Sequence, residues 1–149
     1  MQTLQPIDES LALLLARARE SLMMPLRPLL RDADLTEQQW RVLRTVGARS
    51  EMDLTEIAVA TSLLPASLTR IVRDLTDRKL VARREQQRKQ RFAPIYLTRD
   101  GHELIERITP DIIEINEQII DLYGEQRIAN LMKLLREFRE AISSQFSQD

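Results

Sequence analysis

The sequence predicts a mainly α-helical protein with one small β-hairpin. Apolar residues recur every three or four positions through most of the 149 residues, which is the period of amphipathic helices. Glycine occurs three times and aromatic residues make up 4% of the chain, a composition that favours helices over a sandwich or barrel. One short segment near the middle departs from the helical period and has two strand-like runs around a polar tip.

The N-terminal part of the chain predicts two helices. Leu11, Leu15 and Leu22 share a face of a first helix over residues 8–24, which Pro25 and Pro28 kink or interrupt. A second helix begins at Thr36, because Thr36 and Gln39 have the spacing of a capping box. We expect it to end near Gly47, with glycine as the C-terminal cap.

Two short helices with a tight turn between them follow over residues 53–78. Asp53 and Glu56 predict a second capping box, Thr61 and Ser62 form the turn, and Pro65 suits the first position of the next helix. This is the helix-turn-helix pattern. The residues expected on the buried face of its second helix are Leu64, Leu68, Ile71, Val72 and Leu75.

The hairpin is predicted from residues 80–84 and 92–97, with a polar tip at 86–90 between them. Pro94 in the return strand indicates an edge position, since proline cannot donate a ladder hydrogen bond. Two long helices then complete the chain, the first opening at residues 98–101 and ending at Gly124.

Apolar steps of three and four residues run along both long helices and predict a coiled-coil type of seam. Such a seam is typical of helices that pack against one another.

Positive charge is concentrated in one block of the sequence. Residues 64–91 carry nine basic and three acidic side chains, a net charge of +6, whereas residues 1–63 carry −2 and residues 92–149 carry −5. Such a block is typical of a surface that binds phosphates. A solvated charged face would give the same count, so charge alone leaves both interpretations open.

The outward face of the second helix-turn-helix helix favours DNA binding. Small residues permit close approach to a groove, Ser67 and Thr69 can bond bases or phosphates, and Arg70 can bond guanine with two donors. An ordinary helical hairpin with a polar outer face, and a hairpin kept soluble by its charge, are the alternatives. The predicted DNA contacts are Pro65, Ala66, Ser67, Thr69, Arg70 and Arg73 on the helix, and Arg83, Arg84, Arg88, Lys89 and Arg91 on the hairpin.

Several function classes find no support in the sequence. Without cysteine and with His102 alone, which we expect at the surface, neither a metal site nor a cysteine nucleophile is predicted. Neither a catalytic residue set nor a glycine-rich phosphate loop is evident, so we expect no enzyme and no cofactor. With no run of eighteen apolar residues and no secretion signal at the start, we expect no membrane partner and a cytoplasmic location.

Five segments resemble the MarR family of bacterial regulators, in family order and, with the flanking helices, over nearly the whole chain. They are residues 35–43, 54–58, 65–72, 80–84 and 96–101. Within the family the chain looks most like the branch of repressors of homoprotocatechuate (4-hydroxyphenylacetate) degradation operons. The resemblance implies a single domain over residues 1–149. Its winged helix-turn-helix lobe would span 33–100 (helix-turn-helix about 53–78, wing about 80–97), with a helical dimerisation lobe at 7–32 and 101–147. The predicted dimerisation residues of that lobe are Leu11, Leu15, Ile112, Ile115, Ile119, Leu131, Leu135, Phe138 and Ile142.

The resemblance further implies a homodimer that binds a near-palindromic operator in double-stranded DNA as a repressor. A small phenolic or aromatic acid would release it, from a pocket between the dimerisation helices and the DNA-binding lobe. Arg17, Arg19, Trp40 and Arg41 are the candidate ligand contacts, since arginine can pair a carboxylate and tryptophan can stack on a ring. Core packing is the alternative role for Trp40.

One departure from the family concerns the wing. The family has an aspartate two residues before its minor-groove arginine, whereas Lys89 stands there in this chain, so both Arg88 and Arg91 are candidates for that insertion. Two other functions remain open at this point. One is a ligand-independent DNA-binding regulator or anti-repressor, and the other is a helical module that dimerises and binds a protein.

Overall fold

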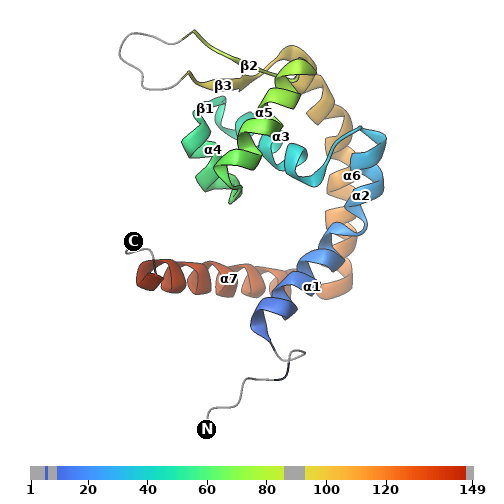
Figure 1. Cartoon of the computed structure of the whole chain (residues 1–149). Helices are drawn as coiled ribbons and strands as arrows, with labels where there is room; N and C mark the ends of the chain where they lie inside the picture. Colours follow the sequence, from blue (N-terminus) through green and yellow to red (C-terminus); the bar gives the residue numbers. More distant parts are fainter. Residues whose placement is uncertain (1–5, 7–9, 86–92, 147–149) are drawn as a thin grey trace. The chain divides into compact units, whose positions relative to one another are not determined.

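The computed structural model describes residue 6 and residues 10–85 and 93–146 (Figure 1). The chain divides into two compact units, Met1–Pro110 and Asp111–Asp149. The helices are α1 (Leu11–Met23), α2 (Leu26–Asp32), α3 (Glu37–Arg49), α4 (Leu54–Thr61), α5 (Pro65–Asp77), α6 (Arg99–Tyr123) and α7 (Glu125–Phe146). The strands are β1 (Glu51–Met52), β2 (Val81–Arg83) and β3 (Ile95–Leu97). The predicted fold class, mainly α-helical with one small β-hairpin, is confirmed.

Proline divides the first predicted helix, as expected. α1 ends at Met23, and α2 begins directly after Pro25. Pro28 lies in the first turn of α2, where a missing N–H breaks no intrahelical hydrogen bond. Leu30 on α2 is buried and anchors this short helix to the core.

α3 begins as predicted and ends later than predicted. The Gln39 backbone N–H donates to Thr36 Oγ1 at 3.1 Å, and the Thr36 N–H donates to Gln39 Oε1 at 2.8 Å, which completes the capping box. The prediction that Gly47 caps the helix was wrong, because α3 continues to Arg49. Gly47 instead permits close packing: a Cβ there would lie 2.8 Å from Leu97 Cδ1.

α4 and α5 form the predicted helix-turn-helix. Asp53 and Glu56 make both hydrogen bonds of the second capping box, each at 2.8 Å. Ser62, in the turn, adopts the left-handed conformation with φ 55°. Pro65 is the first residue of α5, whose buried residues are Leu68, Ile71, Val72 and Leu75, as predicted.

Leu64 is the exception on this face, and its predicted burial was wrong. Its side chain is 75% exposed, and Leu63 is buried in its place. Leu64 is the N-cap residue of α5, with an extended backbone (φ −65°, ψ 140°). The helical spacing that aligns residues four apart therefore does not extend back to it.

The sheet contains one strand that the sequence pattern did not reveal. Its order is β1-β3-β2, with both pairs antiparallel, and Tyr96 lies between Ala82 and Glu51. The prediction of an edge position for the return strand was wrong, because β3 is central. Pro94 is accommodated because it precedes β3, where its carbonyl accepts the Arg84 N–H at 2.9 Å. The predicted hairpin tip falls within 86–92, outside the described residues.

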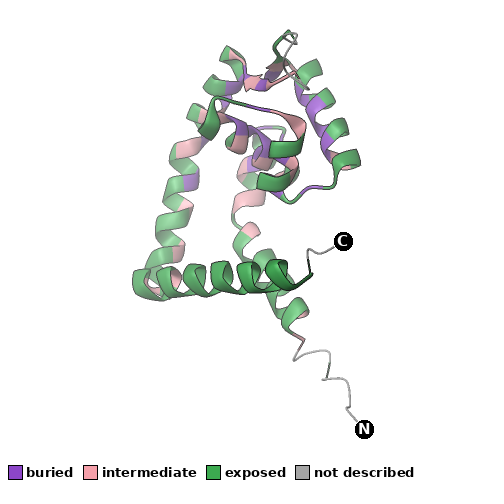
Figure 2. Ribbon diagram, turned by 90° about the vertical axis from the view of Figure 1, so that its left-hand side faces the viewer, coloured by how far each residue is buried: buried purple, intermediate pink, exposed green. Residues whose placement is uncertain are grey.

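Most buried residues lie in α3, α5, α6 and the strands, and Figure 2 colours the buried residues purple. The start of α6 is fixed to the end of α5: Thr98 Oγ1 donates to Lys79 O at 2.5 Å and accepts the Gly101 N–H at 3.1 Å. Gly124, with φ 97°, ends α6 as predicted.

α7 has no buried residue along its described length. Among the predicted dimerisation residues, Ile112 is buried, and Ile115 and Ile119 are half-buried. The exposed members are Leu11, Leu15, Leu131, Leu135, Phe138 and Ile142. In the single chain, α1 and α7 therefore each leave a row of large apolar side chains in contact with water.

Candidate nucleic-acid interface

The face of α5 opposite its buried side carries the predicted DNA contacts. Ser67 is half-buried, and the exposed members are Pro65, Ala66, Thr69, Arg70 and Arg73. Thr69 Oγ1 donates to the Pro65 carbonyl at 3.0 Å, so its hydroxyl hydrogen is already used within the helix. Toward DNA, Thr69 offers an acceptor oxygen and a methyl group.

Arg70 and Arg73 border a shallow cleft of about 570 Å³ beside the start of α3. The cleft also contains the acidic residues Asp74 and Asp77 from the last turn of α5. Arg70 and Arg73 precede Asp74 and Asp77 along the helix, so its exposed cations lie nearer the N-terminus than its acids do. This order suits a helix whose N-terminal residues approach a polyanion.

The described part of the hairpin contributes two arginines. Arg83 and Arg84 are both exposed. Arg84 is held against the sheet, because its Nε lies 3.1 Å from Glu51 Oε2 and its guanidinium lies 5.5 Å from the centre of the Tyr96 ring. Arg88, Lys89 and Arg91 lie outside the described residues, so their predicted roles are not addressed by the structure.

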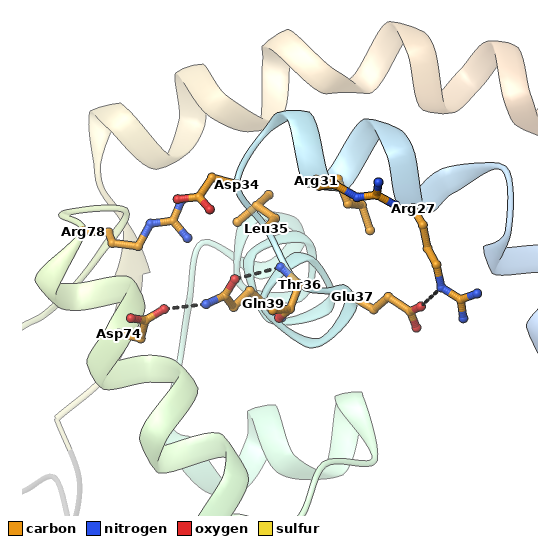
Figure 3. A pocket seen from close by; sticks show the side chains of 10 residues that line it. Arg27, Arg31, Asp34, Leu35, Thr36, Glu37, Gln39, Asp74 and Arg78 are labelled. Carbon is orange, nitrogen blue, oxygen red and sulfur yellow. Dashed lines mark hydrogen bonds and ion pairs between the residues drawn. The ribbon is translucent and has the colours of Figure 1, made fainter.

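Polar contacts fix the C-terminal half of α5 to the junction between α2 and α3 (Figure 3). Gln39 Nε2 donates to Asp74 Oδ2, and Arg78 forms a 3.6 Å ion pair with Asp34. These side chains line a cleft of about 510 Å³. The sequence predicted only the capping role of Gln39, since nothing in it links Gln39 to a residue 35 positions away.

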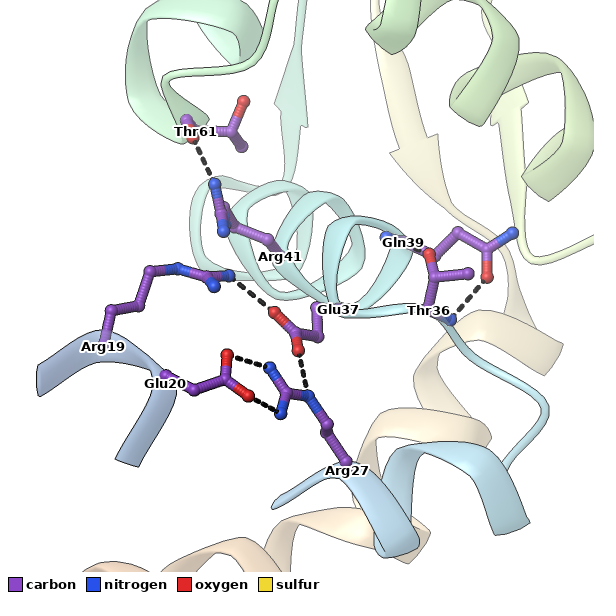
Figure 4. A network of polar contacts seen from close by, with 8 residues as sticks. All are labelled: Arg19, Glu20, Arg27, Thr36, Glu37, Gln39, Arg41 and Thr61. Atoms are coloured by element: carbon purple, nitrogen blue, oxygen red, sulfur yellow. Dashed lines mark hydrogen bonds and ion pairs between the residues drawn. The ribbon is translucent and has the colours of Figure 1, made fainter. Parts of the chain in front are cut away.

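The four candidate ligand contacts lie in different surroundings. Trp40 is 8% exposed and belongs to the core. Arg19 Nη2 contacts Glu37 Oε2 at 2.5 Å, and Arg41 Nη1 donates to the Thr61 carbonyl at 3.0 Å (Figure 4). Arg17 lies exposed on α1, and its carbonyl accepts the Ser21 hydroxyl at 3.1 Å.

A network of charged residues joins α1, α2 and α3 around Glu37, and no motif in the sequence predicts it. Arg27 Nε contacts Glu37 Oε1 at 2.6 Å, while its two Nη atoms hold both oxygens of Glu20 (Figure 4). Hydrogen bonding from Arg27 lowers the pKa of Glu37, and Arg19 adds to this effect. The pKa of Glu20 is also lowered by its hydrogen bond from Arg27.

The described residues contain no group of three or more His, Cys, Asp or Glu side chains that could hold a metal ion. His102 is exposed, as predicted. Within the same part of the chain, no helix has the length and apolar character needed to cross a membrane.

A helix-turn-helix with an arginine-bearing exposed face, followed by a β-hairpin, defines a protein of the winged-helix DNA-binding class. Comparison with known proteins agrees. A family model described as "MarR family" matches residues 33–91. The homoprotocatechuate degradative operon repressor of Escherichia coli is 35% identical over 132 residues, 89% of each chain.

The transcriptional regulator FarR of Neisseria gonorrhoeae is 34% identical over 123 residues, 83% of this chain and 84% of that one. The solved structure of NadR in complex with 4-hydroxyphenylacetate superposes with a TM-score of 0.79 at 33% identity, covering 93% of this chain and 97% of that chain. The chain belongs to the MarR family and is a DNA-binding transcriptional regulator.

Proposed function

We propose that the protein is a homodimeric repressor that binds a near-palindromic operator in the cytoplasm and is released by a small aromatic carboxylate. The exposed face of α5 carries the DNA-binding part of this proposal. That face presents Arg70 and Arg73 beside small residues, while the opposite face is fully occupied by the core. Such a helix can enter a major groove without disturbing the fold.

The apolar surfaces of α1 and α7 support the dimer. Neither helix has a buried residue in the described chain, although both carry large apolar side chains at helical spacing. A second copy would cover these side chains and so provide the burial that keeps them out of water. A two-fold dimer would then place two copies of α5 on half-sites separated by about 34–36 Å, one helical turn of DNA.

The effector part of the proposal is supported by the relatives. The E. coli relative is named for repression of a homoprotocatechuate degradative operon, and NadR was solved with 4-hydroxyphenylacetate. In this chain Arg19 already holds a carboxylate, that of Glu37. An effector carboxylate would compete with Glu37 for Arg19 and favour a dimer whose α5 helices no longer match the half-site spacing. Arg17, Trp40 and Arg41 remain the other candidate contacts.

DNA binding is tested with a duplex selected from a random pool by the wild-type protein. Fluorescence anisotropy measures its affinity at several salt concentrations. We expect a steep loss of affinity with salt, and a shallower slope for the double variant Arg70→Ala, Arg73→Ala. Arg107→Ala, which removes an exposed arginine of α6, is the matched control. A shallow wild-type slope would favour the protein-binding module instead.

The effector is tested on the same complex with 4-hydroxyphenylacetate. We expect the acid to weaken DNA binding, and the neutral alcohol with the same ring to have no effect, because only the acid can pair with an arginine. Arg19→Ala should reduce the response to the acid. If affinity stays constant across a panel of aromatic acids, the ligand-independent regulator is the better description.

A further inference from the structure

At position 64, a leucine side chain neither caps a helix nor packs in the core. It is the N-cap of α5, where Ser, Thr, Asp or Asn would accept a backbone N–H, and leucine is among the poorest residues for this role. No side-chain hydrogen bond caps the helix there. The side chain is also 75% exposed, so it contributes little to the core. Neither the stability of the helix nor core packing explains a leucine at this position.

The surroundings of Leu64 are apolar at the tip and cationic beyond it. Pro65 and Ala66 are exposed and carry no polar side-chain atom. Arg70 and Arg73 lie further along the same helix. The tip of α5 is therefore an apolar surface that two exposed arginines follow along the helix, and it begins the segment 64–91, which carries a net charge of +6. Charge complementarity makes DNA the occupant of this surface.

We propose that Leu64 recognises the C5-methyl group of a thymine in each operator half-site. The N-terminal residues of a recognition helix contact base edges in the major groove. Thymine is the one base that presents a methyl group there, and apolar side chains contact it. This inference rests on the proposed function. It adds sequence selectivity that the arginines, which bond phosphates or guanine, do not supply.

The test compares wild-type protein with Leu64→Ser. Serine is a favourable N-cap, so this variant should be at least as stable as wild type, and a change in DNA selection cannot be attributed to unfolding. Val59→Ser is the matched control, because Val59 is 79% exposed but lies on α4. Each protein selects duplexes from one randomised pool. Wild type and Val59→Ser should share a preferred thymine that Leu64→Ser no longer selects.

Replacing that thymine by uracil removes the methyl group alone. Wild-type affinity should fall roughly fourfold per half-site, the factor expected for one buried methyl group, and Leu64→Ser affinity should not change. Identical base preferences for wild type and Leu64→Ser, or no effect of uracil on wild type, would overturn this inference while leaving DNA binding intact. If wild type enriched no duplex at all, the proposed function itself would fail.

Discussion

The Nε of Arg27 on α2 donates to Oε1 of Glu37, the first residue of α3, at 2.6 Å. Arg19 of α1 reaches the other oxygen of the same carboxylate. Gln39, two residues after Glu37, closes the capping box of α3 and donates to Asp74 on α5. The start of α3 therefore lies between the charged network of α1 and α2 and the helix proposed to read DNA.

Replacing Glu37 by Gln should lower stability near neutral pH, and the difference from wild type should diminish in acid. Because Arg27 lowers the pKa of Glu37 below its usual 4.5, the folded state gains stability when the carboxylate is ionised. That gain is fully present above the unfolded-state pKa and is lost as pH falls through the lower folded-state pKa. Urea unfolding should give a constant difference from about pH 7 to about pH 5.5, and a smaller one at about pH 3.5.

Glu103→Gln is the control for this experiment. Glu103 forms an exposed pair with Arg99 on a single helix, at 2.7 Å. Exposed pairs four residues apart contribute little, so its effect should be small at each pH. If Glu37→Gln showed no loss near neutral pH, the network would not be stabilising α3.

Gly101→Ala should destabilise the protein by about 3 kcal/mol or more, the upper range for overpacking. A Cβ at Gly101 would lie 2.1 Å from the backbone oxygen of Leu80, and backbone cannot move aside as a side chain can. Thermal or urea unfolding measures the loss.

Gly47→Ala is the matched comparison. There the Cβ would meet the terminal Cδ1 of Leu97, which can rotate, and alanine gains about 1 kcal/mol of helix propensity over glycine. We expect a net change within about 1 kcal/mol of zero. Equal effects of the two variants would contradict the packing described for Gly101.

Asp53→Ala should cost about 1 kcal/mol by removing the N-cap of α4. Its Oδ1 accepts the Glu56 N–H at 2.8 Å, and alanine leaves that donor without its partner. Asp53→Asn keeps an acceptor oxygen and should retain most of the stability. Urea midpoints distinguish the two variants, and a loss of equal size in both would assign the effect to charge instead of capping.

Phe138→Asp should dissociate the proposed dimer, since it places a charge within the apolar row of α7. Sedimentation velocity should show wild type as a dimer and the variant as a monomer. The affinity of the Phe138→Asp variant for DNA should also fall, because a monomer contacts only one of the two half-sites. Arg136→Glu, an exposed residue of α7 outside the row, is the charge-changing control and should remain dimeric. A dimeric Phe138→Asp protein would place the dimer surface elsewhere.

Features that depend on neighbouring residues could be predicted from the sequence. The capping boxes at Thr36 and Asp53, the proline at the start of α5 and the glycine after α6 act within one helical turn, so their spacing sufficed to predict them. The buried face of α5 beyond its first residue followed from helical spacing for the same reason.

Features that join distant segments could not be predicted in this way, because they depend on the folded arrangement of the chain. β1 has two residues, too few to show an alternating pattern, and exists because β3 offers it a partner. The contact between Gln39 and Asp74 and the arginine network around Glu37 depend on how helices pack against one another. Leu64 illustrates both levels. The spacing of apolar residues predicted that its side chain is buried. Because Leu64 is the N-cap residue of α5 and has an extended backbone, its side chain lies in solvent instead.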